Sequence, residues 1–483
     1  MPNLFDLPPE LREATIRRIF ELSKSTTPIP QLSTAVPTLF SLPNELLDEI
    51  VDCVPPKDFE NLALSCKHLY QFAGYERRHR HFTFTRWLKS IENGWGALTR
   101  HYFPELLGEF LDMPNVADYV DEVAVKPWNM CWYATPLSGD DGKDDGLWKK
   151  KNYWAKSKEH DMHPPYTDSL MKAFEGAVNS ARFIPTEEKG HWISKIKAGD
   201  ENPVIALLFS RLDYMTSLLI VLKNQQDHFI LKTLQRIAKN PLWSSLSRLC
   251  NLKIFGNLLP SHRFRSIAAC AALPSIVSLE ARELVEEPLD SAEPSLELKP
   301  HLSSVRNLKI RDCRFSAQTI FSLIRSAKSL QSFTYTYYRE GSSISCAWVR
   351  AALLRYASRS LEELTLHDSR FLPDWDGTGC SFRSYCNLRV LTIDYGLLMG
   401  NKYYETNKIV SLLPSSLEVL NLHKCRFYLL EWFRDFVNWV IRVKSRLLPC
   451  LKELNFKEVW SWFSSEEVLE IAAGAPFCIN FGI

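Results

Sequence analysis

Eight nine-residue segments in the second half of the chain share one spacing of apolar residues. Each segment has apolar side chains at its first, fourth and sixth positions, and the segments recur about every 29 residues. This alternation predicts a strand with one buried face, while sequences between the segments, such as SAQTIFSLIRSA, have helical spacing. Because each unit leaves apolar faces that only a neighbour can cover, the units must stack. The segments begin at Leu249, Ile276, Val305, Leu330, Leu361, Leu388, Leu417 and Leu451.

The segments follow the pattern LxxLxLxxN/C and resemble leucine-rich repeats. The resemblance implies a curved solenoid with a parallel sheet on the concave side and helices outside. Weaker matches that begin at Met215 and Val120 extend the array towards the N-terminus. In such repeats an Asn or Cys at the ninth position bonds the turn backbone, so a structural role is implied for Asn257, Cys313 and Cys425.

The fifth and seventh positions of each segment should face the concave side, because strand side chains alternate. In the middle of the array these positions are charged and mostly basic, with Glu280, Arg282, Lys309 and Arg311, and guanidinium groups suit carboxylate and phosphate oxygens. Either this patch meets an acidic or phosphorylated segment, or Glu280 neutralises its neighbours on a solvated face. The candidate substrate-binding residues are Lys253, Phe255, Glu280, Arg282, Lys309, Arg311, Thr334, Thr336, Thr365, His367, Asp394, Asn421, His423, Asn455 and Lys457.

Residues 41–72 combine several helix starts with a large apolar surface. Pro43 suits a first helical turn, and the residues from Leu46 to Val54 form an apolar stripe that Pro55 and Pro56 end. A segment this short cannot bury its apolar surface alone, so it needs either a partner or its own chain. The segment resembles an F-box through Leu42, Pro43, Glu45, Leu46, Leu47, Ile50, Asp58, Leu62, Leu64, Ser65, Cys66, Lys67, Leu69 and Tyr70.

The F-box resemblance implies docking on a Skp-type adaptor, which joins the chain to cullin and RING subunits of an SCF ubiquitin ligase. The chain is then a non-catalytic receptor whose repeats hold the protein to be ubiquitinated. An interaction scaffold that never leads to ubiquitination is the alternative. The sequence leaves open which of the following residues contact the adaptor and which form the F-box's own core: Leu42, Pro43, Leu46, Leu47, Ile50, Val54, Phe59, Leu62, Leu64, Cys66 and Leu69.

Composition favours protein partners. A net charge of +2 gives no electrostatic footprint for nucleic acid or an anionic membrane. The absence of a long apolar run or a leader-like start predicts an intracellular protein, cytoplasmic or nuclear. The 12 cysteines form no CxxC pair, which argues against a disulfide framework and a zinc ribbon.

Motifs of enzyme chemistry are not found, so we predict no catalytic residue, cofactor or metal. The sequence has no HExxH, GxxxxGK[ST] or GxSxG pattern, and the acidic run GDDGKDDG fails the EF-hand template. His160 and His163 offer two metal ligands, but spacing fixes no third.

The predicted organisation is an α-helical F-box followed by an α/β solenoid. By resemblance to fungal F-box proteins with leucine-rich repeats, the array starts near residue 104. A Trp-rich, charged insertion interrupts it. Its long loop either packs across the solenoid's edge or reaches a substrate, or else residues 138–160 are disordered and solvated. The predicted parts are an N-terminal helix and flexible linker (1–38), the F-box (39–82), connecting helices with a possible first repeat (83–125), the insertion (126–202) and the solenoid (203–483).

Overall fold

The computed structural model divides the chain into two compact units, Met1–Arg80 and His81–Ile483. The structure describes residues 42–54, 59, 61–62, 65, 67–72, 74, 102–112, 114–125, 166–221, 228–240, 246–256, 263–264, 267–286, 298–337, 346–368, 381–399, 410–425, 430–457, 470 and 475–482. The predicted N-terminal helix and linker (1–38), His160 and His163 lie outside these residues, and so do four tryptophans of the insertion: Trp128, Trp132, Trp148 and Trp154.

The first unit contains helix α2 (Asn44–Cys53) and helix α4 (Lys67–Phe72). Helix α2 begins where the sequence predicts. Pro43 is its N-cap, and the Pro43 carbonyl accepts hydrogen bonds from the amides of Leu46 and Leu47, each 3.1 Å long. Glu45 lies in the first turn, where a negative charge is favoured by the helix dipole. The helix ends before extended Val54, as expected for a residue preceding a proline.

The second unit is built on an unclosed sheet of 11 parallel strands, whose spatial order is the order of the strands along the chain. Every one of the eight predicted segments forms a strand in this sheet, and so do the weaker matches upstream. A short second sheet pairs β4 (Arg263–Phe264) with β6 (Val285–Glu286). The strands of the large sheet are β1 (Glu122–Val125), β2 (Ser217–Val221), β3 (Asn251–Phe255), β5 (Ser278–Arg282), β7 (Asn307–Arg311), β8 (Ser332–Tyr337), β9 (Glu363–Asp368), β10 (Val390–Asp394), β11 (Val419–His423), β12 (Glu453–Lys457) and β13 (Cys478–Gly482).

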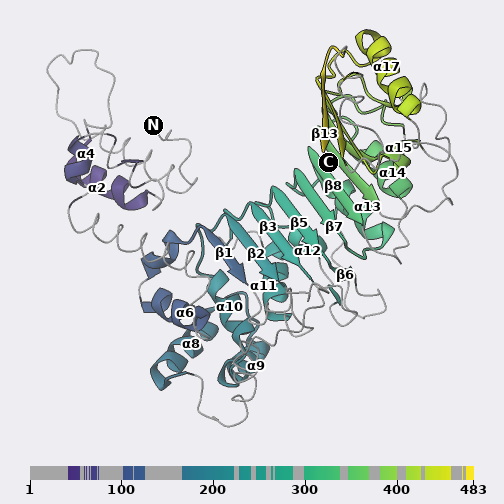
Figure 1. Ribbon diagram of the computed structural model, residues 1–483. Coiled ribbons are helices and arrows are strands. Elements are labelled where there is room, and N and C mark those ends of the chain that lie inside the picture. Colours follow the sequence, from purple (N-terminus) through teal and green to yellow (C-terminus); the bar gives the residue numbers. More distant parts are fainter. Residues whose placement is uncertain are drawn as a thin grey trace, which may run out of the picture. The chain divides into compact units, whose positions relative to one another are not determined.

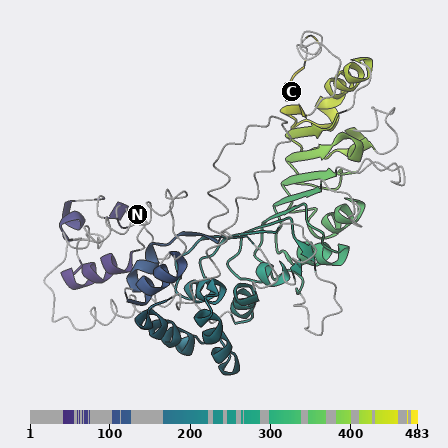
Figure 2. The same cartoon turned by 60° about the horizontal axis from the view of Figure 1, so that its bottom comes forward.

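Helices lie in most of the connections between successive strands and line one face of the sheet (Figures 1 and 2). At the fourth and sixth positions of all eight segments, the apolar side chains are at most 1% exposed. The other face carries no helix among the residues that the structure describes, and its side chains are mostly half-buried. The helices are α6 (Tyr102–Asp112), α8 (Asp168–Ser180), α9 (Thr186–Lys197), α10 (Glu201–Phe209), α11 (His228–Lys239), α12 (Ile267–Ala271), α13 (Ala317–Ser326), α14 (Cys346–Tyr356), α15 (Tyr395–Met399) and α17 (Leu430–Leu447), with 3₁₀ helices η3 (Pro114–Tyr119) and η6 (Val410–Leu412).

Much of the predicted insertion belongs to this core rather than standing apart from it. Helices α8 and α9 and the start of α10 fall within residues 126–202. Thr167 caps α8 through a 3.3 Å hydrogen bond from the Leu170 amide, and Asp200 caps α10 through a 3.0 Å bond from the Asn202 amide. Trp192 of α9 is buried among the core residues. Helix α10 is buried on all sides from residue 204 to 209, as expected for a helix with no polar stripe.

Three strands are followed by a residue with left-handed backbone at the eighth position of its segment. These residues are Glu283, Asp312 and Lys424, with φ of 55°, 52° and 52°. Left-handed backbone is uncommon outside glycine and turns the chain sharply. The turn takes the chain out of the sheet plane immediately after the strand, so three charged side chains stand at the carboxyl edge of the sheet.

Candidate functional site

The structure sorts the predicted adaptor-binding residues of the first unit into interior and surface. Leu47, Val51, Phe59 and Leu69 are buried, and Val54 and Leu62 pack against the Val51–Phe59 pair. Leu64 and Cys66 lie outside the described residues. The interior set therefore holds the helices together and is not available to a partner.

The surface set lies mainly at the start of helix α2. Pro43 is exposed, and Leu42, Leu46 and Ile50 are half-buried. Tyr70 of α4 is also an exposed large apolar residue, at 44%. Exposed apolar side chains that are contiguous on a small unit mark an interaction surface. The most accessible candidates for adaptor contact are therefore Leu42, Pro43, Leu46 and Ile50.

In the second unit, the open face of the sheet brings the predicted substrate residues into rows. Strand register places Lys253 beside Glu280, and Glu280 beside Lys309. It likewise places Arg282 beside Arg311. Neighbouring strands are roughly 4.8 Å apart, so these side chains are in reach of one another.

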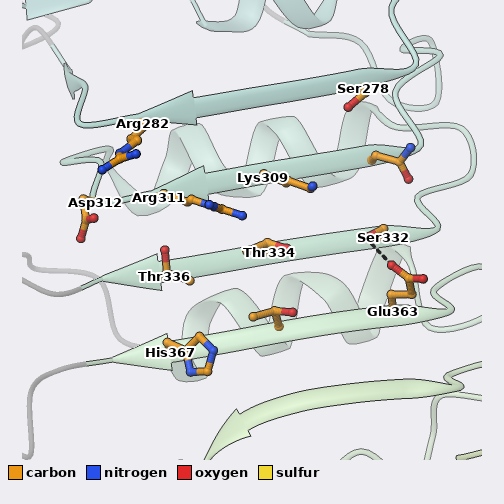
Figure 3. A pocket seen from close by; sticks show the side chains of 12 residues that line it. Ser278, Arg282, Lys309, Arg311, Asp312, Ser332, Thr334, Thr336, Glu363 and His367 are labelled. Carbon is orange, nitrogen blue, oxygen red and sulfur yellow. Dashed lines mark hydrogen bonds between the residues drawn. The ribbon is translucent and has the colours of Figure 1, made fainter. Parts of the chain in front are cut away.

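A hollow of about 730 Å³ lies over β5, β7, β8 and β9 on this face (Figure 3). Arg282, Lys309 and Arg311 supply its positive charge, and Asp312 and Glu363 its negative charge. The rest of the lining is neutral and polar: Ser278, Asn307, Ser332, Thr334, Thr336, Thr365 and His367. Four of the lining residues occupy the third position of their segments: Ser278, Asn307, Ser332 and Glu363. The same alternation turns third positions to this face, but the list of candidate substrate-binding residues included only fifth and seventh positions.

The cations of the hollow are only loosely neutralised. Arg311 Nε lies 3.8 Å from Glu280 Oε1, which is beyond hydrogen-bond distance, and Arg282 Nε lies 3.3 Å from Glu283 Oε1. The Lys309 ammonium forms no hydrogen bond or ion pair with any residue that the structure describes. Glu280 therefore balances only a part of the basic charge around it. The alternative in which Glu280 neutralises all its neighbours does not describe this patch.

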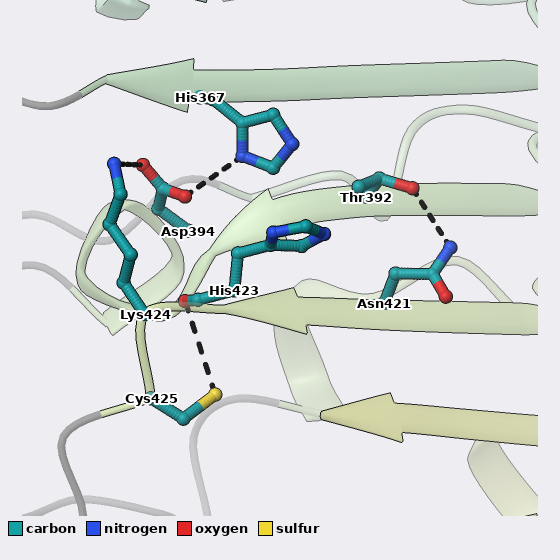
Figure 4. Close-up of polar contacts among 7 residues, drawn as sticks. All are labelled: His367, Thr392, Asp394, Asn421, His423, Lys424 and Cys425. Carbon is teal, nitrogen blue, oxygen red and sulfur yellow. Dashed lines mark hydrogen bonds and ion pairs between the residues drawn. The ribbon is translucent and has the colours of Figure 1, made fainter. Parts of the chain in front are cut away.

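Further along the same face several polar side chains are buried, and those on β9 and β10 are bonded to partners. Thr334, Thr336, His367 and Asp394 are less than 9% exposed. Asp394 Oδ1 is 2.8 Å from His367 Nδ1, and Asp394 Oδ2 accepts a 2.9 Å bond from Lys424 Nζ (Figure 4). Both carboxylate oxygens are thus occupied, which is the physical reason that these side chains can be buried.

Ionisation in this buried group follows from the contacts. Burial opposes the charge of Asp394, but the hydrogen bond and charge of His367, with the Lys424 charge, outweigh it and hold the Asp394 pKa below its ordinary value. His423 packs edge-on against His367, with ring centroids 4.3 Å apart. Burial, aided by the charges of His367 and Lys457, lowers the pKa of His423 to about 4. His423 Nε2 has no hydrogen-bond partner in the described part of the chain.

A ladder of side-chain amides continues the fifth-position row to the last strand. Asn480 donates to Asn455 at 2.7 Å, Asn455 donates to Asn421 at 2.8 Å, and Asn421 donates to Thr392 at 2.9 Å. Each of these groups has a neighbour on the adjacent strand as its partner. Asn421 and Asn455, predicted as substrate-binding residues, are therefore engaged in the sheet itself.

The remaining predicted residues differ in exposure. Lys253 and Lys457 are exposed, while Phe255 and Thr365 are half-buried. The Arg282 guanidinium lies 6.0 Å from the Phe255 ring centroid. Lys424, which fixes Asp394, was missed because it follows the strand, and its left-handed turn is what returns its ammonium to the sheet edge.

The ninth-position cysteines are structural, as predicted. Cys313 Sγ lies 3.3 Å from the Arg311 carbonyl, and Cys425 Sγ lies 3.9 Å from the His423 carbonyl. Burial raises the pKa of Cys313 to about 12 and also raises that of Cys425. A thiol with a raised pKa is a poor nucleophile. Asn257 lies outside the described residues.

Comparison with known proteins identifies the first unit. Residues 39–81 match the F-box domain family, which supports an F-box protein. F-box domains bind Skp-type adaptors in SCF complexes. No curated protein matches the chain.

None of the helices that the structure describes is sufficiently long and apolar to span a membrane. Among the same residues, no group of three or more His, Cys, Asp or Glu side chains is arranged to hold a metal ion.

Proposed function

We propose that this chain is the substrate-recognition subunit of an SCF-type ubiquitin ligase. The F-box match at residues 39–81 is the observation that carries the proposal. On this proposal the F-box docks on a Skp-type adaptor, and through it on cullin and RING subunits. The chain acts inside the cell, in cytoplasm or nucleus, and is not itself an enzyme. It contributes proximity, because a bound substrate is held near the ubiquitin-transferring subunits.

The second unit is interpreted as the substrate-binding part, a leucine-rich-repeat solenoid of the kind found with F-boxes in fungal proteins. Two observations support the interpretation. The strands recur with the repeat spacing and are all parallel, and one sheet face is left without helices among the described residues. Repeats that stack in this way present one extended face to a partner.

Co-purification with a Skp-type adaptor tests the docking step. The double variant Leu46→Asp, Ile50→Asp places charges on the half-buried surface set while leaving Leu47 and Val51 in the interior. Each apolar side chain buried at an interface contributes roughly 1.5–3 kcal/mol, so adaptor affinity should fall by about 100-fold or more. The matched control is Asp48→Asn, Glu49→Gln, which changes exposed residues of the same helix.

The result that contradicts the assignment is adaptor binding by the Leu46→Asp, Ile50→Asp variant equal to that of the original chain. Cullin co-purification separates the ligase subunit from the scaffold alternative. A chain that binds adaptor but brings down no cullin would favour the scaffold.

A further inference from the structure

The hollow over β5, β7, β8 and β9 has an excess of positive charge at its centre. Arg282 and Arg311 lie in register on adjacent strands, and Lys309 lies two residues before Arg311 on the same face. Like charges placed this closely on a sheet are destabilising. Glu280, the acidic residue among them, has a side chain only 15% exposed and stays 3.8 Å from Arg311 Nε. Glu283, which follows β5, lies with its Oε1 3.3 Å from Arg282 Nε, whereas Lys309 has no ion pair with a described residue. Lys309 and Arg311 are therefore the least neutralised cations of the hollow.

The two acidic residues of the lining stand at opposite ends of this hollow. Figure 3 shows Asp312 beyond the arginines at the carboxyl edge and Glu363 beside Ser332 near the other edge. Ser332 donates a 3.1 Å hydrogen bond to Glu363, so that carboxylate is turned to its own strand neighbour. A run of carboxylates laid along the hollow would meet both acidic ends. A single concentrated dianion at the centre would meet only the cations.

We propose that this hollow binds the phosphate of a phosphorylated serine or threonine in a protein segment, an assignment that rests on the proposed substrate-recognition function. A phosphate carries about −1.5 to −2 charge at neutral pH and three strong acceptor oxygens. Arg311 and Arg282 supply donors in a fork that fits two of those oxygens, and Lys309 supplies a point charge. A volume of about 730 Å³ holds the phosphate together with flanking residues of an extended segment.

The neutral lining favours the same ligand. Thr334 and Thr336 lie beside Lys309 and Arg311 in the next strand, by register. Thr336 Oγ1 is buried and has no hydrogen-bond partner in the described part of the chain. Hydroxyl donors add hydrogen bonds to an oxyanion without adding charge. A hydrophobic or cationic segment would leave the Thr336 hydroxyl and the Lys309 ammonium without a partner and the two arginines with only their loose ion pairs, which is costly.

Peptide binding by the full chain, co-purified with a Skp-type adaptor, tests the proposal. The probes are three fluorescein-labelled peptide mixtures with random flanking residues and a fixed centre of phosphoserine or phosphothreonine, of glutamate, or of unmodified serine or threonine. Fluorescence polarisation gives the affinities. The phosphorylated mixture should bind at least about tenfold more tightly than either other mixture, since bonds to charged groups contribute about 1.5–3 kcal/mol.

Two variants locate the site. Lys309→Gln should weaken binding of the phosphorylated mixture about tenfold, and Lys309→Gln, Arg311→Gln about 100-fold. Lys172→Gln is the matched control, because Lys172 is an exposed lysine of helix α8 and does not line the hollow. It should change binding less than about twofold. Because Lys309 has no described partner, the single variant tests the site even where the double variant fails to fold.

The outcomes separate this inference from the proposed function. Equal binding of the phosphorylated and glutamate mixtures, or binding unaffected by Lys309→Gln, overturns the phosphate assignment while adaptor binding stands. Failure of the adaptor to co-purify overturns the proposed function instead.

Discussion

Two sections of one sheet face use polar residues in opposite ways. On β5 and β7, the charged side chains are half-buried or exposed and only loosely paired. On β9, β10 and β11, His367, Asp394 and Asn421 are bonded to partners on neighbouring strands or turns. The positions in the repeat are the same in both sections. A polar residue on the open face is therefore a candidate for binding only where its hydrogen-bonding groups are not already used.

The hydrogen bonds on β9, β10 and β11 also explain why a histidine beside an aspartate is not a catalytic site here. In a catalytic pair the carboxylate orients a histidine that acts on a nucleophile. Lys424 occupies the second oxygen of Asp394, and the pair is buried. The neighbouring thiol, Cys425, has a raised pKa because it is buried. The charge of the Asp394 carboxylate is balanced inside this cluster by Lys424 and His367.

The largest expected effect is the removal of Asp394. In Asp394→Ala, the Lys424 ammonium and His367 lose their common partner inside a buried environment. Breaking a buried pair by removing one member costs roughly 3–5 kcal/mol, and we expect the free energy of unfolding to fall by that amount. Denaturant unfolding followed by circular dichroism measures it. Glu453→Ala, at an exposed position of β12, is the control and should cost less than about 0.5 kcal/mol. A similar small loss for Asp394→Ala would show that the buried section is not held by this carboxylate.

The next effect is a dependence of stability on pH that comes from His423. Its pKa is lowered from 6.5 to about 4 in the folded chain, so between these values the unfolded chain binds a proton that the folded chain does not. Stability should therefore fall as the pH drops from about 6.5 to about 4, by at most about 3.5 kcal/mol at about 1.4 kcal/mol per pKa unit. Asp394, whose pKa is lowered from 3.8, adds a further loss only at still lower pH, as its carboxylate becomes protonated.

Unfolding free energies measured across this pH range check the assignment. His423→Gln should flatten the slope between about pH 6.5 and about pH 4. His301→Gln, a change of an exposed histidine on the same unit, should leave it unaltered. An equal slope in the His423→Gln variant would assign the pH dependence to other groups.

The sequence predicted the backbone structure of the second unit better than the availability of its side chains. The strands were predictable because two apolar positions per segment must be buried, and that demand fixes both strand and register. Strand β13 was missed, since Pro476 stands where the spacing calls for a leading apolar residue, although Ile479 and Phe481 keep the inner positions. Helices α8 and α9 were assigned to an insertion because no strand segment accompanies them.

Side-chain availability was not predictable from alternation. Alternation says which side of a sheet a residue faces, but not whether a neighbour already uses its polar atoms. The alignment of repeats brings His367 and Asp394 side by side, whereas the third member, Lys424, depends on a left-handed turn with φ of 52°. In the first unit, Leu46 and Leu47 are adjacent in one apolar stripe, and only packing separates the half-buried residue from the buried one.

The smallest effect on stability should come from the loosely paired section, and it sharpens the contrast with Asp394. Lys309 forms no ion pair with a described residue and lies among cations, so Lys309→Gln should change the free energy of unfolding by less than about 0.5 kcal/mol. Raising the salt concentration from about 0.1 M to about 1 M screens the repulsion in the original chain more than in the variant, so the difference between them should shrink. Denaturant midpoints of both proteins at the two salt concentrations measure this. A loss above about 1 kcal/mol in Lys309→Gln would mean that the lysine already has a structural partner, and the two sections of the face would then not differ in kind.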